Sequence, residues 1–420
     1  ITINAATGAE QLISTFSSTV NTGTLVITSS ASGNKSAAAT VVGNLTASGA
    51  VTLTGADNAA ATLNLQGTTN SASSVALDTD TGIATLTLNA TNGVMAFTGT
   101  IDGASATEGV LVVKDDDADA AGDLVTFNSA IGVNTQLADV QIGSTTEAGN
   151  ALFKAAVDSV LITFEGGDHS NETAKAEFQS SITATTINLD DNTGASTLTV
   201  NATNGAQTVA GAINGVTAGD GTLAIIDDDA DAGPQAITFS GIVGASNRLG
   251  AITVGNSAQA GSSIFSANAT VTVTTVTVTG GDHANEDSAV EFQEGLTATS
   301  VSLDNNSGTA AVTFNAANGA QTVNATINAA SAGEGILAII DDGAGAAPDV
   351  VTLSGQIGGT ARVGSLTVGN STQGGSALFT SANSVVVTTV TVTGGNHASE
   401  DSLIEFQDAL TATTVTLNDS

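Results

Sequence analysis

Apolar and polar residues alternate along short segments that recur through the whole chain, as they do in half-buried β-strands. In the central part such segments begin near Leu198, Leu223, Ile252, Thr275 and Thr299, at fairly even intervals of the size seen in known repeat units. Shorter apolar clusters lie between them. Each interval therefore predicts strand, turn, strand and turn, which is the pattern of a parallel β-solenoid whose coils stack on one another.

A second, longer period is superimposed on these strand intervals. The turn sequence Gly166-Gly-Asp-His returns at Gly280 and, with asparagine in place of aspartate, at Gly394, so that the spacing is constant. A second marker, which begins with Leu-Asp or Leu-Asn, has the same phase. These markers divide the chain into a shortened first repeat over 1–76, full repeats over 77–188, 189–302 and 303–416, and the start of a further repeat over 417–420.

A repeat of this length also fits a string of tandem β-sandwiches, which is the alternative fold. The shortened first repeat favours the solenoid. Leu25 precedes Val51 by a single interval, whereas the equivalent Leu223 and Val276 are two intervals apart. The difference is one coil, and a solenoid tolerates its loss because each coil contacts only its neighbours. A sandwich that lost a strand pair would lose the closure of its core. We therefore predict an all-β, elongated, parallel β-solenoid.

The phenylalanines keep the same phase. Because large aromatic residues are mostly buried, we expect them to fill the coil rather than to form a ligand platform. Eight of the 12 phenylalanines fall at three positions of the repeat, namely Phe127 and Phe239, then Phe153, Phe265 and Phe379, then Phe178, Phe292 and Phe406.

The charge of the chain restricts its partners. Forty acidic residues face six basic ones, which gives a net charge of −34. Nucleic acids and anionic membranes are bound by clusters of Lys and Arg, so neither is an expected partner. The chain contains no apolar run long enough for a membrane-spanning helix, so none is predicted. An acidic surface instead attracts cations.

Acidic turns are the candidate cation sites. Clustered carboxylates suit calcium, which takes six to eight oxygen ligands, although a solvated acidic turn is an equally open interpretation. The pattern lacks the glycine and the distal glutamate of an EF-hand loop. The candidate calcium ligands are Asp115, Asp116, Asp117 and Asp119 in the first turn, Asp227, Asp228, Asp229 and Asp231 in the second, and Asp341 and Asp342 in the third.

The Gly-Gly-Asp/Asn-His turn holds all three histidines of the chain, each followed three positions later by a glutamate. Histidine beside carboxylates suits zinc or another transition metal. A glycine turn whose polar side chains bond the backbone is the simpler interpretation, and repetition favours it. We therefore predict a structural role for His169, His283 and His397, with Glu172, Glu286 and Glu400 beside them.

Two segments carry a resemblance to a known class of proteins. In 239–255 and 353–369, an apolar strand is followed by Gly, small residues and a Leu-x-x-Ile-x-Val-like strand. This pattern resembles the β-strand-repeat surface proteins of Gram-negative bacteria, which include S-layer proteins and autotransporter passengers. The resemblance implies a secreted protein, located outside the cell or on its surface.

These observations lead us to expect a structural protein, not an enzyme, that self-assembles into a filament or surface layer. An adhesin or ligand-binding stalk is the alternative. A β-helical enzyme acting on acidic polysaccharides is disfavoured because only six basic residues are present to hold such a substrate.

The partner expected for self-assembly is another copy of the chain, joined head to tail. Ile1-Thr-Ile-Asn matches the segment that begins at Leu198, and Leu417-Asn-Asp-Ser matches the one that begins at Leu189. The end of one copy is thus nearly in phase with the start of the next, and a head-to-tail contact of this kind gives an open fibre. That the sequence is a piece of a longer chain explains the match equally well.

Overall fold

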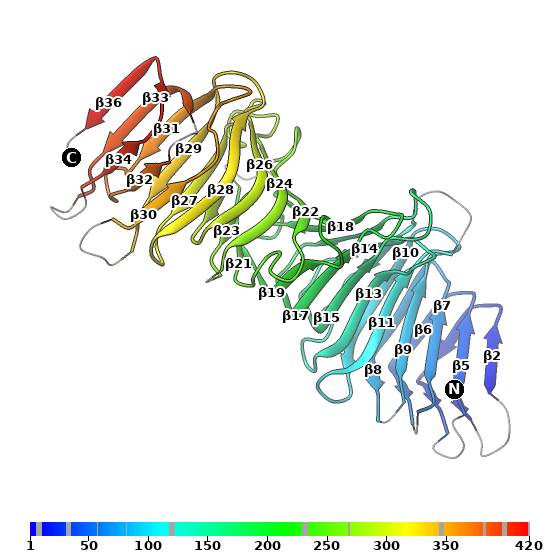
Figure 1. The fold of residues 1–420 in the computed structure, drawn as a ribbon. Coiled ribbons are helices and arrows are strands. Elements are labelled where there is room, and N and C mark those ends of the chain that lie inside the picture. Colours follow the sequence, from blue (N-terminus) through cyan, green and yellow to red (C-terminus); the bar gives the residue numbers. More distant parts are fainter. Residues whose placement is uncertain are drawn as a thin grey trace. The chain divides into compact units, whose positions relative to one another are not determined.

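The computed structural model describes residues 1–5, 11–30, 35–56, 58–80, 82–116, 122–228, 234–267, 269–343, 348–380, 384–396 and 401–418. Within these residues the regular structure is all β, with no helix, and it forms a parallel β-solenoid of about 15 turns (Figure 1). The predicted fold class is confirmed, and tandem sandwiches are excluded. The described segments accordingly offer no helix of the length and hydrophobicity needed to cross a bilayer.

The chain divides into two compact units, Ile1–Thr199 and Val200–Ser420. The strands that begin in the first unit are β1 (Thr2–Asn4), β2 (Leu12–Phe16), β3 (Val20–Thr22), β4 (Leu25–Thr28), β5 (Ala37–Val41), β6 (Leu45–Thr54), β7 (Ala61–Leu65), β8 (Thr69–Asp78), β9 (Ala84–Asn89), β10 (Met95–Gly103), β11 (Glu108–Lys114), β12 (Leu124–Phe127), β13 (Leu137–Gly143), β14 (Gly149–Phe153), β15 (Val157–Glu165), β16 (Ala174–Phe178), β17 (Ile182–Asp190) and β18 (Ser196–Asn201).

The strands of the second unit follow the same plan. They are β19 (Gln207–Gly215), β20 (Thr222–Ile226), β21 (Ala236–Phe239), β22 (Leu249–Val254), β23 (Ser262–Phe265), β24 (Val271–Thr279), β25 (Ser288–Phe292), β26 (Leu296–Asp304), β27 (Ala310–Asn315), β28 (Gln321–Ala329), β29 (Glu334–Ile340), β30 (Val350–Leu353), β31 (Val363–Val368), β32 (Ser376–Phe379), β33 (Val385–Thr393), β34 (Leu403–Phe406), β35 (Leu410–Thr411) and β36 (Thr414–Asn418).

Each unit contains two parallel ladders in which every strand pairs with the equivalent strand one coil away. In the first unit one ladder runs β4-β6-β8-β10-β12-β14-β16 and the other β5-β7-β9-β11-β13-β15-β17. Leu137 pairs with Ser159 across a short coil, and Met95 pairs with Val125 across a long one. The coil length inferred from the sequence pattern therefore agrees with the register.

The register also explains why the first repeat is short. Leu25 of β4 pairs directly with Val51 of β6. The equivalent residues of the second unit, Leu223 and Val276, are separated by a coil, because both pair with Ile252 of β22. The first repeat therefore lacks one coil at this point, and the remaining coils stack without a break.

Side chains that point into the coil form continuous stacks. In the first unit the rings of Phe127, Phe153 and Phe178 lie face to face, with successive centroids 4.7 Å apart. The second unit repeats the stack from Phe239 to Phe314, with centroids 4.8 to 5.8 Å apart. The predicted interior position is confirmed for the seven phenylalanines Phe127, Phe153, Phe178, Phe239, Phe265, Phe292 and Phe379, which are at most 4% exposed, whereas Phe406 on the last described coil is half-buried.

Candidate metal centre

The acidic turns follow β11, β20 and β29 and lie at one edge of the coil. The structure describes the first two aspartates of each turn, whereas Asp117, Asp119, Asp229 and Asp231 lie outside the described residues. The first aspartate of each turn is buried and the second is exposed. The described members of each turn are thus Asp115 and Asp116, Asp227 and Asp228, and Asp341 and Asp342.

The buried aspartate of each turn closes its own loop. Oδ2 of Asp115, Asp227 and Asp341 accepts a hydrogen bond of 2.6 Å from the backbone N–H eight positions later. Such a bond between a carboxylate and a backbone N–H is stronger than a neutral one. The structure therefore gives this carboxylate a loop-closing role, which the sequence analysis had not assigned.

Buried asparagines hold the same turns from the preceding coil. Asn89 Nδ2 donates to Asp116 Oδ2 at 2.7 Å, and its Oδ1 accepts from the Asp116 N–H at 3.3 Å. Oδ1 of Asn201 and of Asn315 accepts from the equivalent backbone N–H groups at 3.4 and 3.2 Å. In the sequence each of these asparagines begins a recurring Asn-Ala-Thr/Ala-Asn-Gly segment, which by itself indicates only a repeat. Their regular return one coil before an acidic turn was the available signal.

The Gly-Gly-Asp-His turn brings a histidine and two carboxylates together. His169 Nδ1 lies 2.8 Å from Asp168 Oδ1 and 3.3 Å from Glu172 Oε2. The ligand atoms of the three residues all lie within 4.8 Å of one another. The imidazole is exposed, with 71% of its side-chain surface accessible, whereas Glu172 is 26% exposed.

The next repeat builds the same arrangement. His283 Nδ1 lies 2.5 Å from Asp282 Oδ1 and 3.6 Å from Glu286 Oε2, again with the three ligand atoms within 4.8 Å. We call these two sets, Asp168/His169/Glu172 and Asp282/His283/Glu286, the histidine triads. In the third repeat the sequence has Asn396, and His397 and Glu400 lie outside the described residues.

Backbone hydrogen bonds fix the glutamate of each triad. In the first, the His169 N–H donates to Glu172 Oε2 at 3.1 Å, and the Glu172 N–H donates to the His169 carbonyl at 3.0 Å. The second triad has the same two bonds at 3.1 Å each. The turn therefore sets the position of the glutamate before any ligand binds.

The two glycines before each triad are required by close packing. A Cβ on Gly166 would overlap the carbonyl oxygen of Gly194 in the next coil, and one on Gly167 would overlap the Glu172 carboxylate. Gly280 and Gly281 have the same surroundings in the second unit. These contacts support the structural role that the sequence analysis assigned to the turn, and they also hold the triad in shape.

Electrostatics at the triads follow from this geometry. The hydrogen bond to Asp168, followed by that to Glu172, raises the pKa of His169 above its ordinary value, because both carboxylates favour the imidazolium. Asp282 is the main cause of the raised pKa of His283, and His283 in turn lowers the pKa of Asp282. Each turn thus favours a positive charge at the imidazole.

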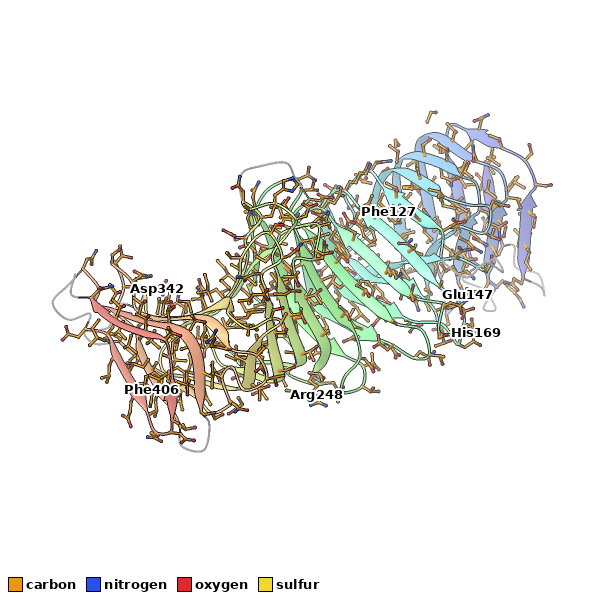
Figure 2. The ribbon with its side chains drawn as sticks, turned by 90° about the horizontal axis from the view of Figure 1, so that it is seen from above. Phe127, Glu147, His169, Arg248, Asp342 and Phe406 are labelled. Carbon is orange, nitrogen blue, oxygen red and sulfur yellow. The ribbon has the colours of Figure 1, made fainter. Side chains whose placement is uncertain are left out.

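One lysine offsets the acidic edge of the first unit. Lys114 Nζ lies 2.7 Å from Glu147 Oε2 and 3.9 Å from Asp116 Oδ2. Glu147 and His169 lie along the same edge (Figure 2), and a Cβ on Gly167 would come within 3.2 Å of the Glu147 nitrogen. In the later repeats Ile replaces Lys114 and Gln replaces Glu147, so the pair is lost together.

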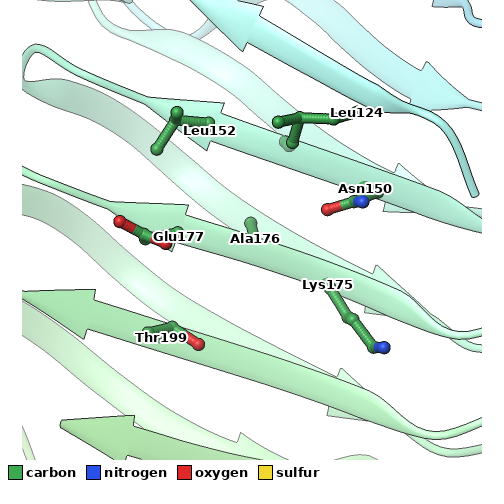
Figure 3. A pocket seen from close by; sticks show the side chains of 8 residues that line it. Leu124, Asn150, Leu152, Lys175, Ala176, Glu177 and Thr199 are labelled. Carbon is green, nitrogen blue, oxygen red and sulfur yellow. The ribbon is translucent and has the colours of Figure 1, made fainter. Parts of the chain in front are cut away.

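The outer face of the first unit carries an open hollow (Figure 3) of about 200 Å³. Its walls are outward side chains of neighbouring strands, among them Asn150 and Leu152 of β14 and Lys175 and Glu177 of β16. Lys175 is exposed and Glu177 is half-buried, and Glu177 Oε1 already accepts from Gln179 Nε2 at 2.8 Å. The hollow is therefore a corrugation of the sheet surface.

Comparisons with models of protein families, with curated protein sequences and with solved structures gave no match.

A half-buried carboxyl group in β13 has a strongly shifted pKa. Partial burial is the main cause that raises the pKa of Asp139 from its ordinary 3.8 to about 6, and Glu165 on β15 adds to it, while Thr163 opposes it. The equivalent residues of the later repeats are Ala251 and Ser365, which carry no charge.

We expect Asp139→Ser to stabilise the first unit at neutral pH. In wild type the Asp139 carboxyl ionises at about pH 4 in the unfolded chain but keeps its proton until about pH 6 in the folded chain. The free energy of unfolding therefore falls as the pH rises from about 4 to about 6. Above about pH 6 the free energy of unfolding of the variant should exceed that of wild type by on the order of 1–2 kcal/mol, after allowance for partial exposure. Denaturant unfolding at several pH values checks this, and an equal difference at about pH 4 and pH 7.5 would contradict it.

Proposed function

We propose that this protein is a secreted structural protein that self-assembles by stacking coils of one copy on coils of the next. The observation that carries the proposal is that coils stack on coils in register within each unit, with apolar side chains buried between them. The last described coil illustrates the apolar surface that such a contact covers. Val415 and Leu417 of β36 are 55% and 76% exposed. Val301 and Leu303, at the same positions of the preceding repeat, are fully buried.

The first coils offer a matching surface. Leu12 and Phe16 of β2 point inward and are half-buried, whereas their partners Ala37 and Val41 in the next coil are fully buried. Exposed apolar positions in register with a strand edge favour addition of a further coil. Contact between two unlike faces continues without closing, so it gives a fibre or a layer.

Calcium is proposed as a stabilising ion of the assembly, held by the outer carboxylates of the acidic turns. The exposed Asp116, Asp228 and Asp342 and the net charge of −34 support this part of the proposal. An ion that binds only the native form stabilises it by mass action.

The test compares two charge insertions in one strand. Leu417→Asp places a carboxylate on the apolar coil face and should abolish assembly, as measured by sedimentation velocity and negative-stain microscopy. Thr416→Asp is the matched control, because neighbouring strand residues point to opposite faces, and it should assemble like wild type. Each protein is measured with calcium and with a chelator at matched ionic strength.

Two outcomes would overturn the proposal. Wild type that stays monomeric at high concentration, with and without calcium, would exclude self-assembly of this chain. Assembly of Leu417→Asp equal to that of the control would exclude the β36 face as the contact. Assembly that is unchanged by the chelator would exclude calcium as a stabilising ion and would leave self-assembly in place.

A further inference from the structure

We propose that each histidine triad binds one divalent transition-metal ion, for which Zn²⁺ is the reference. The proposal does not rest on self-assembly. It concerns a different set of residues, and a different class of ion, from the acidic turns.

Each triad has an excess of hydrogen-bond acceptors around one nitrogen. A histidine Nδ1 carries at most one proton, yet two carboxylate oxygens point at it in both triads, at 2.8 and 3.3 Å in the first and at 2.5 and 3.6 Å in the second. A proton between them satisfies one carboxylate well and the other poorly. A cation placed among the three atoms satisfies both.

The spacing of the ligand atoms is close to that around a zinc ion. Nitrogen and oxygen ligands about 2.0–2.2 Å from a tetrahedral zinc ion lie about 3.3 Å from each other. The distances from Nδ1 to the glutamate oxygen, 3.3 Å at His169 and 3.6 Å at His283, are already close to this value. The aspartate oxygen must withdraw from Nδ1 by roughly 0.5 Å in the first triad and roughly 0.8 Å in the second. Asp168 and Asp282 are 55% and 53% exposed, so they have room to move.

The same arrangement is built twice, each time on a backbone that does not depend on the ion. The N–H of each histidine fixes its glutamate, and the closely packed glycines fix the turn. Ligands that are already in place lose little freedom on binding, which favours affinity. The same triad occurs in equivalent turns of two successive repeats. A chance grouping of charged side chains explains this recurrence poorly.

The ligand types indicate which ion fits. One imidazole and two carboxylates suit zinc and neighbouring first-row ions, whereas calcium prefers an all-oxygen shell of six to eight ligands. With three protein ligands on an exposed turn, the fourth position is open to water or to a group from another molecule. The ion and the proton compete for Nδ1, so binding releases a proton.

The experiment is a calorimetric titration of Zn²⁺ into the purified full chain, with Ca²⁺ in excess to occupy hard oxygen sites. His283→Ala should remove one equivalent of tight binding, and the double variant His169→Ala/His283→Ala should remove two. Glu286→Gln should weaken its site about tenfold or more, while its amide oxygen can still accept the His283 N–H and keep the turn.

Glu294→Gln is the matched control, because it removes the same charge beyond the far end of β25, about 17 Å away for a strand of this length. It should leave both equivalents unchanged. Circular dichroism melts of all variants without metal verify that the fold is kept.

The proposal is overturned if wild type binds no more Zn²⁺ than the double variant, or if Glu286→Gln and Glu294→Gln weaken binding equally. The second result would mean that zinc affinity depends only on the net charge of the chain. Displacement of the zinc by calcium alone would also overturn it, because it would place the ion on oxygen ligands.

Discussion

Replacement of Phe292 by alanine is expected to lower the free energy of unfolding of the second unit by about 3–5 kcal/mol. The ring is fully buried and stacks on Phe265 at 5.2 Å and on Phe314 at 5.8 Å. Removal of the ring leaves a cavity that neighbouring coils cannot fill, because the ladder hydrogen bonds hold their backbones at a fixed spacing.

Phe406→Ala is the matched control, since Phe406 has the same phase of the repeat. It is half-buried, and among the described residues its ring stacks on that of Phe379 alone, at 5.0 Å. We expect its loss to cost about half as much. The chain has no Trp or Tyr, so unfolding is best followed by circular dichroism in denaturant. Equal costs for the two variants would show that the aromatic stack does not act as a continuous core.

A methyl group added at Gly280 is expected to cost about 1–3 kcal/mol. Its Cβ would overlap the carbonyl oxygen of Gly308, which belongs to the backbone of the next coil and cannot rotate away. The coils must therefore separate locally, and this weakens the ladder hydrogen bonds on both sides of the turn.

Gly23→Ala is the control for the loss of chain flexibility, because no atom lies within 4 Å of the position that its Cβ would take. There alanine should be neutral or slightly stabilising, as expected when only the unfolded chain is restricted. Thermal melts of both variants decide the matter. A destabilisation at Gly23 as large as that at Gly280 would mean that close packing between coils is not the cause.

The two kinds of turn show where inference from sequence succeeded and where it stopped. The repeat period placed the acidic turns and the histidine turns correctly at strand ends. It did not show that Asp115 closes its own loop, or that Asn89 holds the turn from the previous coil. Both contacts depend on which atoms the turn conformation brings into range, and residue spacing does not contain that information.

In the histidine turn, too, residue spacing did not show which atoms come into range. The sequence placed Asp, His and Glu close together in one turn, which is compatible with a structural turn as well as with a ligand set. Only the folded turn shows both carboxylates directed at the same Nδ1. That convergence is produced by backbone bonds and by the two glycines, whose need for close packing arises in part from the next coil.

The sequence by itself determined the class of fold, the coil length, the coil missing from the first repeat and the inward position of seven phenylalanines. These features follow from alternation of apolar residues, which has to match the two faces of a strand in every coil. The tertiary structure alone decided the loop-closing aspartates, the buried asparagines and the histidine triads. The physical reason is that residue spacing fixes neither of two things. It does not fix the conformation of a turn, which brings the atoms of the loop-closing aspartates and of the histidine triads into range. Nor does it fix the stacking that places a buried asparagine against the acidic turn of the next coil.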